Sequence, residues 1–275
     1  MEVGLKNNLR VDRFTDPGAY LLDDENNEVL LPNKYIPEGL KEGEDLEVFV
    51  YLDSEDRIIA TTLEPYVYLN SFACLKVKDV NNIGAFLDWG LEKDLFVPFK
   101  EQGKKLEIGQ DVVVFMYKDF QTDRLVASTK LDSFVLNDEC ELEEGQEVDL
   151  LIANRTDLGR NAIIDNEYIG LIYKNEIFQD LYIGDKIKGY VKKIREEGKI
   201  DIALQKQGVQ NIDDASQKVL TILKDNNGSM EVSDKSAPEE IKALFSMSKK
   251  SFKKAIGSLY KSKIIKIEDN KITLL

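Results

Sequence analysis

The four residues Gly18-Ala19-Tyr20-Leu21 return 66 positions later as Gly84-Ala85-Phe86-Leu87. The same offset aligns further residues in order: Pro32 with Pro98, Gly43 with Gly109, Asp45 with Asp111, Tyr51 with Tyr117 and Asp53 with Asp119. The offset then becomes 67, which aligns Arg57 with Arg124 and indicates one extra residue in a hairpin loop. Ordered self-similarity of this kind indicates an internal repeat of about 65 residues.

A weaker third copy follows at an offset of 75 from the second copy. It aligns Gly84 with Gly159, Gly109 with Gly184, Phe115 with Tyr190 and Arg124 with Lys199. Each copy contains a short segment rich in β-branched and aromatic residues, namely LEVFVYL (46–52), DVVVFMYK (111–118) and KIKGYVKKI (186–194). Such segments are typical of strands, and the turn and apolar run after each of them predict a closing hairpin. About five short strands per copy predict one small barrel each.

From about Ala215 the pattern becomes helical. Apolar residues recur at helical spacing in ASQKVLTILKDNNG (215–228), and Ser236 before Pro238 predicts the N-cap of a second helix. We expect Ser248 to cap a third helix whose apolar stripe consists of Phe252, Ile256, Leu259 and Tyr260. The final KIIKIEDNKITLL alternates around a turn, which predicts a β-hairpin. Three short helices followed by a hairpin indicate a winged helix-turn-helix.

Four domains are therefore expected, at residues 1–65, 66–138, 139–210 and 215–275. The first three are barrels, the third being divergent, and the last is a winged helix. The fold class is mainly β with a C-terminal α+β domain.

The composition excludes several classes of enzyme. The chain of 275 residues has no histidine, so a Ser/His/Asp triad, a Cys/His dyad and a His-ligated zinc site are excluded. Cys74 and Cys140 form no metal or redox spacing, and we expect both to be small buried groups in a reducing compartment. The first twenty residues contain no apolar run of signal-peptide length and no later stretch could span a membrane, which predicts a soluble, cytoplasmic protein.

The net charge of −14 is unevenly distributed. Residues 1–65 carry a net charge of −10, residues 66–138 of −2, residues 139–214 of −7 and residues 215–275 of +5. Because neutralisation of phosphates dominates affinity for nucleic acid, the second barrel and the basic C-terminal domain are the expected places for binding.

The repeated pattern of Gly-Ala-aromatic, an apolar segment ending in proline, Gly-x-Asp and a final arginine resembles the S1 RNA-binding domain, an OB-fold barrel. In the third copy, Gly170-Leu171-Ile172-Tyr173 is similar to the corresponding S1 segment. Three such barrels followed by SMSKKSFKKAIGSLYKSKII (246–265) resemble the conserved virulence factor B family of bacterial RNA-binding regulators. This resemblance spans about Leu5 to Leu275 and rests mainly on the order of the domains.

The resemblance implies that nucleic acid crosses the second and third strands of each barrel, where aromatic rings stack on bases and a basic residue meets phosphate. The candidate RNA-binding residues are Tyr20, Arg57, Phe86, Phe99, Lys118, Arg124, Tyr173 and Lys199. The chain departs from the family pattern at two places. It has Pro17 and Ile83 where an S1 domain often has a further aromatic residue, and Pro32, Pro98 and Tyr173 where it often has histidine. We therefore expect modest affinity per barrel, and a spacer role for the third barrel, which has Ile163 in place of an aromatic residue.

Structural alternatives exist for these residues. Tyr20 and Phe86 could be packed in the barrel core. For Phe14 and Phe99, packing in the core and contact with a base are likewise both open. Arg57 and Arg124 lie among acidic residues, so surface ion pairs compete with phosphate binding as an explanation. Trp89 follows Phe86 by three positions, which places it on the opposite face and favours a structural role.

The third helix of the C-terminal domain and the segment after it are rich in lysine. The candidate nucleic-acid contacts here are Lys249, Lys250, Lys253, Lys254, Lys261 and Lys263. The helix has no Arg, Asn or Gln, which argues against readout of base edges and favours contact with an RNA or DNA backbone. The competing interpretation is a solvated lysine face.

The leading hypothesis is a non-enzymatic RNA-binding protein that acts in post-transcriptional control and binds single-stranded RNA with weak sequence preference. DNA remains a possible partner, and neither a cofactor nor a membrane partner is expected. The alternative is a protein-interaction scaffold, because OB barrels and winged helices also serve as docking modules and the acidic first barrel suits a basic protein surface.

Overall fold

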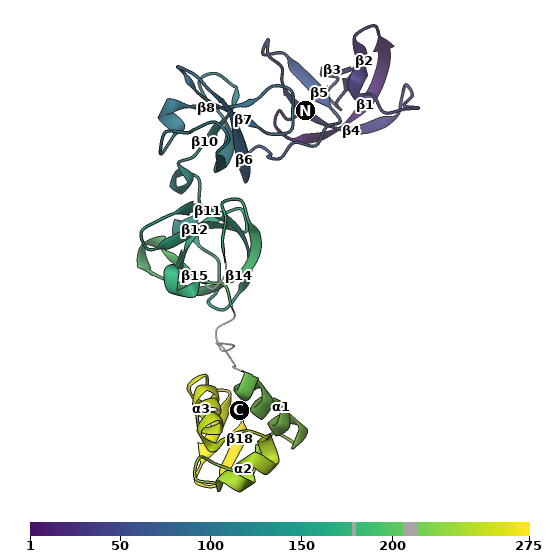
Figure 1. The fold of residues 1–275 in the computed structure, drawn as a ribbon. Coiled ribbons are helices and arrows are strands. Elements are labelled where there is room, and N and C mark those ends of the chain that lie inside the picture. Colours follow the sequence, from purple (N-terminus) through teal and green to yellow (C-terminus); the bar gives the residue numbers. More distant parts are fainter. Residues whose placement is uncertain (178–179, 206–213) are drawn as a thin grey trace. The chain divides into compact units, whose positions relative to one another are not determined.

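The computed structural model describes residues 1–177, 180–205 and 214–275. The chain divides into two compact units, Met1–Ile202 and Ala203–Leu275. The first is built from strands, and the second is mainly helical (Figure 1). Within the described ranges, no helix combines the length and the apolar character that crossing a membrane would need.

The described part of the first unit forms three closed barrels of five strands. Barrel 1 consists of β1 (Lys6–Thr15), β2 (Gly18–Leu22), β3 (Glu28–Pro32), β4 (Asp45–Leu52) and β5 (Ile58–Thr61). Barrel 2 consists of β6 (Ser71–Val80), β7 (Gly84–Asp88), β8 (Leu95–Pro98), β9 (Asp111–Lys118) and β10 (Leu125–Ser128). Barrel 3 consists of β11 (Glu147–Arg155), β12 (Gly159–Ile164), β13 (Tyr168–Tyr173), β14 (Lys186–Ile194) and β15 (Ile200–Ala203).

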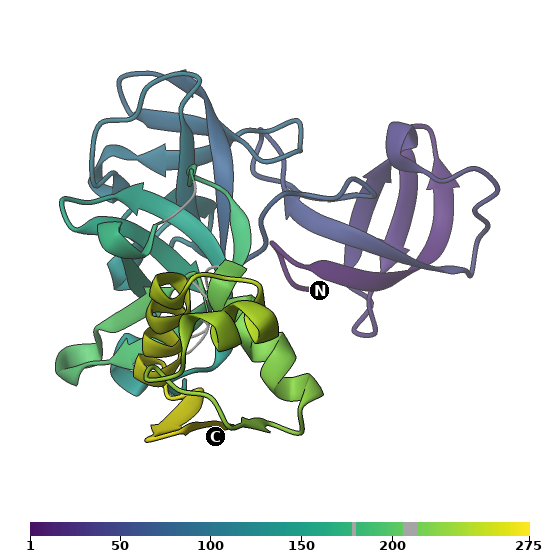
Figure 2. The same ribbon diagram turned by 60° about the horizontal axis from the view of Figure 1, so that its bottom comes forward.

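All three barrels share one topology. The strands are ordered first, second, third, fifth and fourth around the barrel, and the third and fifth strands pair in parallel. The strands of barrel 1, in purple, can be followed around the closed sheet in Figure 2. The prediction of three tandem OB-like barrels is confirmed, while the domain limits at residues 65 and 138 stay a prediction and the limit at residue 210 lies outside the described residues.

The glycine that opens the second strand of each barrel marks a close approach between strands. Gly18, Gly84 and Gly159 pair with Pro32, Pro98 and Tyr173, respectively. A Cβ atom at any of these glycines would collide with the carbonyl oxygen of the residue before its partner. A side chain here would push the second and third strands apart, which explains why glycine returns at this position in the repeat.

Barrels 1 and 2 are joined by an aromatic cluster. The rings of Phe49 and Tyr51 on β4 lie edge-on to Trp89 of barrel 2, with centroids 5.7 and 6.1 Å away. Trp89 is only 2% exposed, and its indole N–H donates a hydrogen bond to the backbone oxygen of Lys93. Trp89 therefore has the structural role that its position in the strand pattern suggests.

Barrels 2 and 3 meet at a second apolar cluster. Phe115 stacks on Phe134, with ring centroids 4.5 Å apart, and lies at a tilt against Phe72, with centroids 4.7 Å apart. Leu151 and Ile163 of barrel 3 pack in the same cluster. The backbone N–H of Phe72 donates to Oδ1 of Asn166 in barrel 3 at 2.8 Å. The thiol of Cys74 faces Gly184 of barrel 3. A Cβ atom added to Gly184 would lie 2.7 Å from this sulfur, so the two barrels approach closely here.

The two cysteines were expected to be buried, but each is partly exposed. Burial nevertheless raises the pKa of Cys74 to about 11. Because the thiolate is the reactive form, we expect iodoacetamide to alkylate Cys74 of the folded chain at least about tenfold more slowly at pH 8.5 than that of the urea-unfolded chain. Mass spectrometry of the Cys74 peptide measures both rates. Equal rates would contradict the raised pKa.

The described part of the C-terminal unit is a winged helix. It consists of α1 (Asp214–Asp225), β16 (Ser229–Met230), α2 (Pro238–Phe245), α3 (Lys249–Lys261), β17 (Ile265–Glu268) and β18 (Lys271–Leu274). The strands form one sheet in the order β16-β18-β17. Phe245 of α2 and Phe252 of α3 pack in its core with ring centroids 4.8 Å apart. The predicted order of three helices and a hairpin is confirmed.

Two details of this domain differ from the sequence prediction. Ser248 caps α3 as predicted, since its Oγ accepts from the backbone N–H of Ser251 at 3.1 Å. The N-cap of α2, however, is Ala237, because the hydroxyl of Ser236 accepts instead from the N–H of Ser233. Tyr260 is not part of the buried stripe but is 55% exposed, since Leu259 takes the core position and the next residue is turned towards solvent.

Candidate nucleic-acid interface

Two phenylalanines lie opposite one another on the second and third strands of barrel 2. The register that pairs Gly84 with Pro98 also pairs Phe86 with Phe96, and their ring centroids are 5.1 Å apart. Both side chains are partly exposed, so neither belongs to the barrel core. The interpretation of Phe86 as a core residue is therefore wrong, and the pair offers an aromatic surface on which a base could stack.

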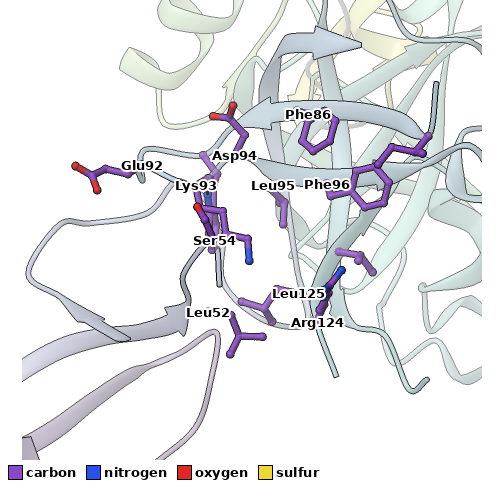
Figure 3. A pocket seen from close by; sticks show the side chains of 13 residues that line it. Leu52, Ser54, Phe86, Glu92, Lys93, Asp94, Leu95, Phe96, Arg124 and Leu125 are labelled. Atoms are coloured by element: carbon purple, nitrogen blue, oxygen red, sulfur yellow. Dashed lines mark hydrogen bonds between the residues drawn. The ribbon is translucent and has the colours of Figure 1, made fainter. Parts of the chain in front are cut away.

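A pocket of about 440 Å³ adjoins this pair, between barrel 2 and the β4–β5 hairpin of barrel 1 (Figure 3). Most of its wall is apolar, with Leu52 from barrel 1 and Ile83 and Leu125 from barrel 2. The charged part of the wall holds Lys93 and Arg124 together with the carboxylates of Glu92 and Asp94. Glu92 pairs with Lys34, and Asp94 pairs with Lys78 at 2.8 Å. We call this cavity the barrel 2 pocket; it combines aromatic, apolar and basic groups, as a site for a base and its phosphate requires.

Arg124 is bound by a carboxylate of barrel 1. Its guanidinium donates to Oδ2 of Asp56, and Nζ of Lys93 lies 3.4 Å from Oδ1 of the same side chain. The Arg124 guanidinium beside Asp56 holds the pKa of that carboxyl below its usual range. The ion-pair interpretation of Arg124 is therefore correct, and phosphate binding at this position stays a prediction.

In barrel 1 the aromatic and basic candidates have separate partners. The guanidinium of Arg13 lies over the ring of Tyr20, 4.3 Å from its centroid, and pairs with Glu28 at 2.5 Å. Arg57 pairs with Asp53 at 2.7 Å and Glu55 at 2.9 Å. Acidic groups thus surround the basic residues of this barrel, in keeping with its net charge of −10.

Phe99 and Lys118 lie outside the barrel 2 pocket. Phe99 begins a short 3-10 turn after β8 and is 47% exposed, whereas Lys118 pairs with Asp123 at 2.9 Å. The adjacent hairpin tip carries Phe120, which is 98% exposed, and Asp119 holds this tip by accepting hydrogen bonds from the residues after it. Phe120 was not predicted, because a single aromatic residue in a turn leaves no periodic signal.

Barrel 3 brings Tyr173 and Lys199 to one pocket of about 570 Å³. Arg195 lies 5.8 Å from the ring centroid of Tyr173, while Lys199 pairs with Glu197 at 2.7 Å. The strand register shows that the counterpart of Phe86 is Asn161. The assignment of Ile163 to that position was wrong: Ile163 is 2% exposed and packs in the cluster between barrels 2 and 3.

The lysines of the winged helix are not equivalent. Nζ of Lys249 donates to the backbone oxygens of Ser236 at 2.7 Å and Lys235 at 3.3 Å, so it holds the turn before α2. Lys253 lies 3.5 Å from a carboxylate oxygen of Asp234. The remaining candidates are exposed on α3 or just after it: Lys250, Lys254, Lys261 and Lys263.

Phe96 and Lys93 are among the pocket residues that the sequence prediction missed. Phe96 could have been found, because pairing Gly84 with Pro98 fixes the residue opposite Phe86. Lys93 lies in the loop before β8, and no motif distinguishes it from the other lysines.

This chain is similar to known proteins over most of its length. Residues 3–63 and 71–130 match the S1 domain family, and residues 217–274 match the CvfB-like winged helix domain. The chain is 28% identical to conserved virulence factor B of Staphylococcus saprophyticus over 245 residues, which are 86% of this chain and 81% of that protein. The chain is thus similar to the conserved virulence factor B proteins over most of its length.

Two further proteins are similar to nearly the whole chain. The Bacillus subtilis protein YitL is 28% identical over 271 residues, which are 95% of this chain and 90% of that protein. A crystal structure of a multidomain protein with nucleic acid binding domains from Streptococcus pneumoniae TIGR4 covers 99% of this chain and 98% of its own, with a TM-score of 0.50 and 22% identity. The two chains therefore share their fold. The S1 and winged-helix domains make this a protein of nucleic-acid-binding type.

Proposed function

We propose that this protein binds single-stranded RNA in the cytoplasm and acts, without catalysis, in post-transcriptional control of gene expression. The main support for this proposal is the pair of rings of Phe86 and Phe96, which lies beside Lys93 and Arg124 in the barrel 2 pocket. Stacking on exposed rings tolerates any base, which accounts for the weak sequence preference that we expect. The winged helix, with a net charge of +5, would add contacts to the RNA backbone.

Phe86→Ala tests this proposal. Removing the ring should weaken binding of a fluorescent oligoribonucleotide at low salt by about 5- to 150-fold, because stacking on an aromatic side chain contributes about 1–3 kcal/mol per base. Fluorescence anisotropy measures the affinity of the full chain. Phe86→Tyr should bind like the wild type, since it keeps a ring.

Phe14→Ala is the matched control, because Phe14 is a 41% exposed phenylalanine of barrel 1 outside the barrel 2 pocket. Thermal unfolding should show that all three variants are folded. No RNA binding by the wild type, or equal affinities for Phe86→Ala and Phe14→Ala, would refute the proposal. In the first case the scaffold alternative gains support, and purification of partners with and without nuclease treatment tests it directly.

A further inference from the structure

We propose that Lys93 and Arg124 form a binding site for an RNA backbone phosphate, and that the carboxylate of Asp56 of barrel 1 competes with the phosphate for this site. This inference rests on the proposed function. It adds that an acidic side chain of the protein competes with RNA for the basic site. RNA would bind barrel 2 by displacing a carboxylate of the same chain.

The first observation is the set of donors around Asp56. Its two oxygens face the guanidinium of Arg124 and the ammonium of Lys93, and Nζ of Lys93 also donates to the backbone oxygen of Asp53 at 2.6 Å. A guanidinium beside an ammonium is a donor set that binds carboxylates and phosphates alike. The carboxylate of Asp56 thus stands where an anionic oxygen of RNA could stand.

The second observation is that Asp56 differs from its neighbours. The carboxylates of Asp53 and Glu55 pair with Arg57 of their own barrel. Among the ion pairs of the described residues, Asp56 has partners only on barrel 2, Arg124 and Lys93. The hairpin therefore directs a single carboxylate across the interface.

The repeat shows why this carboxylate crosses. The counterpart of Asp56 in barrel 2 is Asp123, with a similar backbone φ of +57° against +61°, and Asp123 pairs with Lys118 of its own hairpin at 2.9 Å. The position of Lys118 is taken in barrel 1 by Leu52. Because barrel 1 lacks that lysine, Asp56 pairs with barrel 2 instead.

The third observation is location. Lys93 and Arg124 line the same pocket as Phe86 and Phe96, so a nucleotide stacked on the rings would have its phosphate near both cations. Leu52 and Ser54 of the hairpin line that pocket as well. The aromatic cluster of Phe49 and Trp89 can keep the barrels joined while the Asp56 side chain turns away.

The test is the affinity of the full chain for a fluorescent oligoribonucleotide. Asp56→Asn should tighten binding about two- to fivefold at 50 mM salt, the range expected for release of one exposed ion pair. Asparagine tolerates the positive φ of +61°, so the turn is kept. Glu55→Gln is the matched control, since it removes the same charge from the same hairpin without a partner on barrel 2.

The triple variant Asp56→Asn/Lys93→Gln/Arg124→Gln should bind no tighter than the double variant Lys93→Gln/Arg124→Gln, because both cations that Asp56 masks are gone. Equal affinities for Asp56→Asn and Glu55→Gln, or a gain that persists when both Lys93 and Arg124 are replaced, would overturn the inference. If Phe86→Ala weakens binding in the same series, the proposed function stands although the inference fails. Absence of RNA binding by every variant overturns both.

Discussion

Phe49→Ala should lower the free energy of unfolding of the three-barrel unit by about 3–5 kcal/mol, the usual cost of truncating a buried phenylalanine to alanine. Phe49 is 2% exposed and packs against three other aromatic rings, with centroids 5.7 Å from Trp89, 5.9 Å from Tyr68 and 6.2 Å from Tyr51. The alanine would leave a cavity where barrel 1 meets barrel 2. Urea unfolding followed by the fluorescence of Trp89, the chain's single tryptophan, measures the change.

Phe14→Ala provides the comparison, because the same truncation at a 41% exposed side chain should cost much less. Phe49→Leu should fall between the two, since it keeps most of the apolar volume. If Phe49→Ala were no less stable than Phe14→Ala, the aromatic cluster would not hold the two barrels together. The displacement of Asp56 by RNA would then open the whole interface and not the hairpin alone.

The repeat made the barrels predictable because the repeated residues meet the steric requirements of neighbouring strands within one barrel. Gly84 returns where a side chain would collide with the opposite strand, and its partner Pro98 fixes the hairpin register. The helix stripe of α3 was predictable for the same reason, except at Tyr260, where spacing alone could not decide which of two adjacent residues faces the core.

Contacts between repeats could not be predicted. The pairing of Asp56 with Arg124 joins residues 68 positions apart, and no sequence pattern in either hairpin predicts it. The sequence could only leave open whether Arg124 binds an acidic side chain or a phosphate. Lys249 shows a similar limit, since its position among five other lysines concealed its hydrogen bonds to the turn before α2.

Replacing four lysines of the winged helix should weaken RNA binding at least about tenfold at 50 mM salt. The variant carries glutamine at Lys250, Lys253, Lys261 and Lys263. The slope of log affinity against log salt concentration is negative, and each cation that neutralises a phosphate of single-stranded RNA contributes about 0.7 to its magnitude. Removing four such cations should therefore reduce the magnitude of the slope by up to about 3. Lys249 is left intact, because its hydrogen bonds to Ser236 and Lys235 support the fold.

The matched control replaces Lys218, Lys224, Lys242 and Lys271 by glutamine. These four lysines are exposed in the same domain but lie outside α3 and the segment that follows it, so both variants lose the same net charge. If the winged helix contacts the RNA backbone through α3, only the first variant should show a much lower salt slope. A salt slope reduced by the same amount in both variants would mean that the domain acts through its overall charge. A slope that stays at the wild-type value in both variants would mean that these lysines are merely solvated.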